Sequence, residues 1–121
     1  MIKDVTDLEV YQNSLSLIQQ IYAFIRQLPK SELDSISQIR RAAKSVTANI
    51  AEGFAKRSSE KEFKRFLKIA IGSSHEIVTH LRTIYFAVPR LQPEMKNLAE
   101  EYKTLSKRLN KLHSIWKSDK F

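Results

Sequence analysis

Apolar residues recur along the chain at alternating spacings of three and four, with polar and charged residues between them. This spacing is typical of amphipathic helices that pack at shallow angles. The pattern predicts four helices, over residues 6–28, 32–57, 59–87 and 93–117. In the first helix the predicted core stripe consists of Leu8, Tyr11, Leu15, Ile18, Tyr22 and Ile25.

Residues that stop or start helices separate these four stretches. Pro29 ends the first predicted helix, and Ser31 is expected to cap the second. Ser59 is followed three residues later by Glu62, which is the spacing of a capping box, and Pro93 suits the first turn of the last helix. The pattern therefore predicts an all-α, up-down antiparallel four-helix bundle that forms one domain over residues 1–121.

The helices carry more apolar surface than one bundle needs. The first has a second stripe, formed by Val10, Leu17, Ile21, Phe24 and Leu28, and the third adds Ile69, Ile71, Val78 and Phe86. A helix on the surface of a bundle needs only one apolar face, and additional faces usually mark a subunit contact. We therefore expect a homo-oligomer; the alternative is a wide core with some exposed apolar side chains.

A column of small and polar residues runs beside the core stripe of the second predicted helix. It consists of Ala42, Ser45, Asn49 and Gly53, with Glu52 slightly further round. Small residues let another helix approach closely, and a polar side chain such as Asn49 can set the register of a contact. We assign this column to the oligomer interface; the alternative is a solvated flank of the helix.

The chain has a formal net charge of +8, and the excess is local. Residues 40–68 contain nine basic and three acidic side chains, and residues 103–121 contain six and one. Basic stripes without neutralising partners suit a phosphate backbone, although they also occur as solvated faces. The predicted phosphate contacts are Arg40, Arg41, Lys44, Lys56, Arg57, Lys61, Lys64, Arg65, Lys68, Lys103, Lys107 and Lys111.

The sequence gives little support to catalysis or metal binding. His75 and His80 are five residues apart, about 140° round a helix, and therefore cannot bind one metal ion from a shared face. The chain contains no Gly-rich phosphate loop and no nucleophile elbow. We predict a protein that is not an enzyme and that needs no metal or other cofactor.

The absence of cysteine fits a reducing compartment, and no segment resembles a signal peptide or a membrane span. We therefore expect a cytoplasmic protein without membrane contact.

The segment "SQIRRAAKSVTANIAEGFAKRSSEKEFKRFLKIAIGSSHEI" (Ser37 to Ile77) resembles a family signature. It is similar to that of the bacterial four-helix-bundle proteins encoded by intervening sequences in large-subunit ribosomal RNA genes. The resemblance implies that the chain assembles into a ring of identical subunits, and we expect a homopentamer. It also implies kinship with accessory proteins of diversity-generating retroelements, which are similar pentamers that bind nucleic acid and a reverse transcriptase.

Two classes of function are compatible with these observations. The first is an oligomeric protein that binds RNA or DNA without reading its sequence, because no base-reading element is present. The second is a protein-interaction scaffold whose basic patches bind an acidic protein partner.

Overall fold

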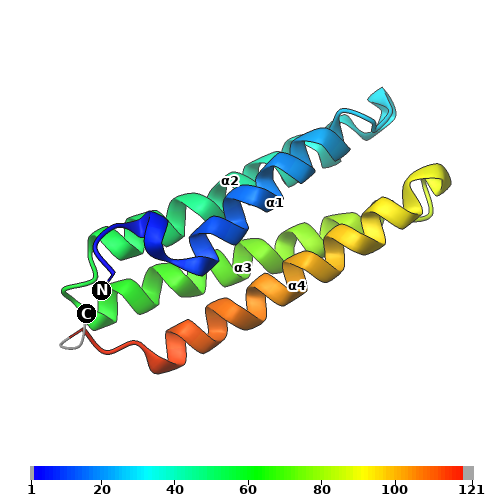
Figure 1. Ribbon diagram of the computed structural model, residues 1–121. Coiled ribbons are helices and arrows are strands. Elements are labelled where there is room, and N and C mark those ends of the chain that lie inside the picture. The colour runs from blue at the N-terminus through cyan, green and yellow to red at the C-terminus, as the bar shows by residue number, and fades with distance from the viewer. Residues whose placement is uncertain (1, 119–121) are drawn as a thin grey trace.

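The computed structural model describes residues 2–118, which form four antiparallel helices and contain no strand (Figure 1). The helices are α1 (Glu9–Ile25), α2 (Leu33–Ala55), α3 (Glu60–Ile84) and α4 (Gln92–Ile115). Short 3-10 helices precede three of them, at Val5–Asp7, Lys30–Glu32 and Pro89–Leu91. The all-α class and the four helices are thus as predicted.

The helix ends agree with the predicted caps at two of three places. Ser59 caps α3, since its hydroxyl accepts a hydrogen bond from the Glu62 amide at 3.2 Å, and Pro93 lies in the first turn of α4. The predicted cap at Ser31 is wrong, because this residue lies within a 3-10 turn and no side chain caps α2. A similar 3-10 turn near the N-terminus, Val5–Asp7, is capped by Asp4 and precedes α1, which therefore begins at Glu9.

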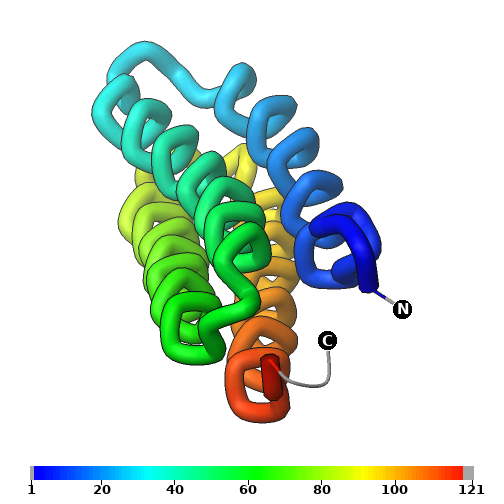
Figure 2. Tube along the Cα trace, turned by 90° about the vertical axis from the view of Figure 1, so that its left-hand side faces the viewer, coloured from blue at the N-terminus to red at the C-terminus, as the bar shows by residue number. Residues whose placement is uncertain are grey.

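Helices that follow one another in sequence lie side by side, and α1 also packs against α4 to close the bundle (Figure 2). The α1–α2 and α3–α4 turns share one end of the bundle, and both termini lie at the other (Figure 1). There the chain returns over the α2–α3 turn: the ring of Trp116 meets that of Phe63 edge-on, with centroids 4.4 Å apart. The Ser118 hydroxyl donates to the Arg57 carbonyl oxygen at 2.7 Å, which holds this segment in place.

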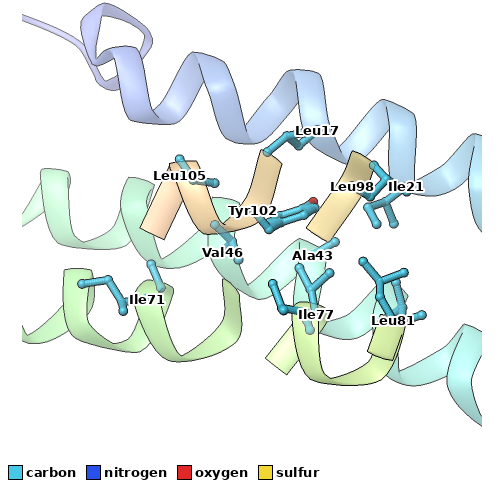
Figure 3. Packing of buried hydrophobic residues seen from close by; sticks show 14 of the residues in the cluster. Leu17, Ile21, Ala43, Val46, Ile71, Ile77, Leu81, Leu98, Tyr102 and Leu105 are labelled. Atoms are coloured by element: carbon cyan, nitrogen blue, oxygen red, sulfur yellow. The ribbon is translucent and has the colours of Figure 1, made fainter. Parts of the chain in front are cut away.

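Tyr102 of α4 lies in the centre of the core, surrounded by apolar side chains from the other helices (Figure 3). Burial raises the pKa of its phenol well above the usual range. The neighbours from other helices that Figure 3 labels include Leu17, Ala43, Val46 and Ile77.

The two apolar stripes of α1 lie the other way round from the prediction. Val10, Leu17, Ile21 and Phe24, expected on a subunit contact, are buried in the core of one chain. The middle of the predicted core stripe lies at the edge of the core instead: Leu15 is 38% exposed, and Tyr11, Ile18 and Tyr22 are half-buried and pack against the core from the side. The inward stripe is aliphatic and aromatic without hydroxyls, whereas the stripe at the edge of the core contains two tyrosines whose hydroxyls prefer contact with water.

Candidate nucleic-acid interface

The basic residues predicted to contact phosphate lie on several sides of the bundle. At about 100° per residue, Arg40 and Lys44 lie on the side of α2 that is turned away from α3. Lys111 borders a groove formed with Leu8 and Glu9 at the start of α1. A single surface that joins all twelve residues is therefore not present.

Two of these residues lie at the α2–α3 turn and cover aromatic rings. The Lys56 ammonium lies 4.9 Å from the ring centroid of Phe66, and the Arg57 guanidinium lies 4.0 Å from that of Phe54. Arg57 also donates to the Phe54 carbonyl oxygen at 3.1 Å, so its guanidinium is fixed against the turn. These two cations therefore help to pack the turn.

Five of the predicted residues form ion pairs with glutamates, contrary to the expectation of stripes without neutralising partners. The pairs are Arg41–Glu76 (3.6 Å), Lys56–Glu52 (3.6 Å), Lys64–Glu60 (3.5 Å), Arg65–Glu62 (3.0 Å) and Lys103–Glu100 (3.5 Å). All of them are at least partly exposed, and exposed pairs contribute only about 0–1 kcal/mol. Such pairs open at low cost when a phosphate competes for the cation.

Basic side chains from two helices meet on the surface between α3 and α4. Lys64 and Lys68 of α3 lie near His113 of α4, and together with burial they lower the pKa of its imidazole; burial has the larger effect. At the opposite end Arg82 of α3 shares a groove with Lys96 and Lys103 of α4. We call this surface the α3–α4 face; its basic residues are Lys61, Lys64, Lys68, Arg82, Lys96, Lys103 and Lys107.

Arg82 and Lys96 of this face were not among the phosphate contacts predicted from the sequence. They belong to a stretch, residues 69–102, that has three basic and four acidic side chains, so counting charge by segment hid them. A usable signal was present in α4, where Lys96, Lys103 and Lys107 are spaced by seven and four and therefore lie on one side of the helix.

The column on α2 contacts α3 of the same chain. Ala42 and Gly53 are buried there, and a Cβ added to Gly53 would lie 2.8 Å from the Cβ of Phe66 and 2.9 Å from Cδ1 of Phe63. The glycine thus permits a close approach of two helices, as expected, but the partner helix lies within the bundle.

The polar members of the column have partners close by. The Ser45 and Ser73 hydroxyls are 2.7 Å apart and join α2 to α3. The Asn49 amide donates to the Ser45 carbonyl oxygen at 2.8 Å, within its own helix, and Glu52 pairs with Lys56 one turn later. Of these groups Ser45 therefore supports the α2–α3 contact, whereas Asn49 and Glu52 find their partners within the same stretch of chain.

The additional apolar residues of α3 divide between the core and the surface. Ile71 and Val78, expected at a subunit contact, are buried within the chain. Ile69 is 40% exposed, and Phe86, just beyond the end of α3, is 83% exposed. Only the latter two are thus available to a partner of the folded chain.

Within residues 2–118, no group of three or more His, Cys, Asp or Glu side chains is placed to hold a metal ion. Among these same residues no helix is long and apolar enough to cross a membrane.

Comparison with protein families matches residues 6–111 to the family described as 23S rRNA-intervening sequence protein. The match includes all of α1, α2 and α3 and most of α4. Comparison with curated protein sequences finds no match.

Proposed function

Because the chain belongs to the 23S rRNA-intervening sequence protein family, we propose that it is a non-enzymatic homo-oligomer that binds RNA or DNA through phosphate contacts. The observation that carries this proposal is the α3–α4 face: Arg82 of α3 shares a groove with Lys96 and Lys103 of α4 at one end, and Lys64 and Lys68 of α3 lie beside α4 at the other.

The charge balance of this face favours a polyanion. Of its seven basic residues, Lys64 and Lys103 pair with glutamates, and the other five form no ion pair among residues 2–118. A phosphate backbone offers one negative charge at regular intervals, and two parallel rows of cations can follow it. The lowered pKa of His113 fits the same picture, because it reflects in part the positive potential of Lys68 and Lys64.

Recognition by such a face is independent of base sequence. Lysine ammonium groups on helix surfaces contact phosphates, and phosphate contacts carry no base information. Binding is therefore expected to weaken steeply as the salt concentration rises. Each phosphate contact should make the slope of log affinity against log salt steeper by about 0.7 to 0.9.

Self-association is the second part of the proposal. Tyr11, Leu15, Ile18 and Tyr22 form a partly exposed apolar stripe along α1, and such a stripe on a protein surface suits a contact with another copy. We propose a ring of five subunits, as the family resemblance implies. In a ring each weak phosphate contact is repeated, and avidity multiplies its effect.

The test compares two double variants with the same charge change and the same spacing. Lys64→Glu/Lys68→Glu reverses the charge on the α3–α4 face, and Arg40→Glu/Lys44→Glu does so on the side of α2 turned away from α3. Binding of labelled single- and double-stranded RNA and DNA is titrated at two salt concentrations. The first variant is expected to lose most of its binding. Since two phosphate contacts are removed, its slope of log affinity against log salt should become shallower by at least about 1.4 to 1.8. The second variant is expected to bind nearly as the parent does.

Helicity and oligomer mass of both variants serve as controls for folding. Equal losses in the two variants would contradict the placement of the site on the α3–α4 face. No binding of any nucleic acid by the parent protein at low salt would refute the function and favour a scaffold for an acidic protein partner.

A further inference from the structure

An open groove of about 350 Å³ lies between α3 and α4 at the end of the bundle that carries the α3–α4 turn. Its lining is partly apolar, with Leu81 and Met95 at its base, and partly basic, with Arg82, Lys96 and Lys103. It continues the α3–α4 face to the tip of the molecule.

The groove contains the most exposed of the large apolar side chains in residues 2–118. Phe86 is 83% exposed, and Tyr85 meets it edge-on, with ring centroids 5.1 Å apart and planes inclined by 85°. Since most of the Phe86 side chain stays exposed despite this contact, it presents a broad aromatic surface to solvent. A flat aromatic surface of this kind is suited to stacking against another flat π-system.

The charges around the ring select an anionic ligand. Arg82, Lys96 and Lys103 line the groove together with one carboxylate, that of Glu100, which lies 3.5 Å from the Lys103 ammonium. The lining therefore has a net charge of +2, next to an aromatic ring. Aromatic rings flanked by cations are the recurrent elements of surfaces that bind single-stranded nucleic acid.

We propose that Phe86 stacks on an unpaired base of single-stranded nucleic acid, whose flanking phosphates are bound by Arg82 and Lys96. This inference rests on the proposed function, and it adds a ligand class to it: a strand with unpaired bases. Continuity with the α3–α4 face favours this occupant over an acidic peptide. From Lys68 to Arg82 the helix rises about 21 Å, roughly the length of six stacked nucleotides, so one short strand can contact both.

The test uses labelled ten-nucleotide strands in a binding titration. The ligands are an oligo-dT strand, a strand of the same length with an abasic site at every position, and a duplex of the same length. The proteins are the parent, Phe86→Ala, Phe86→Trp and Leu33→Ala. Leu33 is a matched control, because it is 65% exposed at the same end of the bundle and lies outside the groove.

Phe86→Ala is expected to bind the intact strand roughly 5- to 150-fold more weakly than the parent, which is the usual effect of removing one stacking ring. It is expected to bind the abasic strand and the duplex as the parent does, since neither offers an unpaired base. Phe86→Trp is expected to retain binding, and Leu33→Ala to leave it unchanged.

The outcomes separate this inference from the proposed function. If the parent binds all three ligands and Phe86→Ala binds them equally well, base stacking is refuted and phosphate binding by the α3–α4 face stands. If the parent binds no nucleic acid, both fall. A decrease in oligomer mass on Phe86→Ala, or binding of an acidic peptide that depends on Phe86, would assign the groove to a second copy or to a protein ligand and overturn the inference.

Discussion

The two glycines of the chain provide a matched pair of substitutions, because both lie inside helices and differ in their surroundings. Gly53 of α2 is buried against α3, whereas Gly72 of α3 is exposed and an added Cβ there would meet no atom within 4 Å. Replacement of either glycine by alanine gains about 0.5–1 kcal/mol of helix propensity. Only at Gly53 does the methyl group have to enter occupied space.

The expected magnitude follows from the contact distances. At Gly53 the new Cβ would lie 2.8 Å from Phe66 Cβ and 3.3 Å from the Phe63 carbonyl oxygen, whereas carbon atoms in contact prefer about 3.5–4.0 Å. The Cβ and the carbonyl oxygen are attached to the backbone of α3, so the whole helix has to move. Overpacking of a core costs about 1–3 kcal/mol. Since the propensity gain is common to both sites, Gly53→Ala is expected to be about 1–3 kcal/mol less stable than Gly72→Ala.

Thermal unfolding followed by circular dichroism at one fixed protein concentration measures this difference. For a chain of 121 residues, 1 kcal/mol corresponds to about 4 °C in the melting temperature. Gly72→Ala should melt a few degrees above the parent, and Gly53→Ala roughly 4 to 12 °C below Gly72→Ala. Equal increases in both variants would show that α2 and α3 do not approach closely at Gly53, and the packing argument would fail.

Four further predictions concern the core, the basic face and assembly. Trp116→Ala removes a buried ring that packs on Phe63 and should lower the free energy of unfolding by about 3–5 kcal/mol, measured by urea denaturation with circular dichroism because Trp116 is the sole tryptophan. The pKa of His113 should rise when a short oligonucleotide binds, since phosphates offset Lys68 and Lys64; an unchanged pKa in an NMR titration of the saturated complex would place the ligand elsewhere. Because folding lowers this pKa, the imidazole should also make stability fall as pH drops through about 6.5, and His113→Gln should lessen that fall. Light scattering should give about five times 14.1 kDa for the parent and a smaller mass for Leu15→Glu, whereas a parent of 14.1 kDa would refute self-association.

Helix number, order and approximate ends could be predicted from the sequence because their causes are local. Apolar periodicity defines a helix within itself, and residues such as Pro93 and Ser59 act on the turn in which they stand. Ser31 shows the limit of this reasoning, because a serine can cap a helix only if the chain enters at the right place, and here a 3-10 turn intervenes.

The candidate site was predicted less completely, because it depends on neighbours that are distant in sequence. The cluster of basic residues in α3 was evident from composition, but its partners Lys96 and Arg82 lie in a segment without excess charge. Likewise, the sequence presented Phe86 only as surplus apolar surface, and its place beside three cations follows from the antiparallel packing of α3 and α4.

By itself, the sequence determined the all-α class, the four helices, the resemblance to the family and the presence of a close contact at Gly53. The tertiary structure decided which stripe of α1 faces inward, that the contact of Gly53 is with α3 of the same chain, and which cations share a face. The physical reason is the same in each case. An amphipathic helix specifies its own apolar and charged faces, but two competing apolar stripes, or two rows of cations on different helices, acquire their roles only when the rotation and pairing of the helices are set by packing.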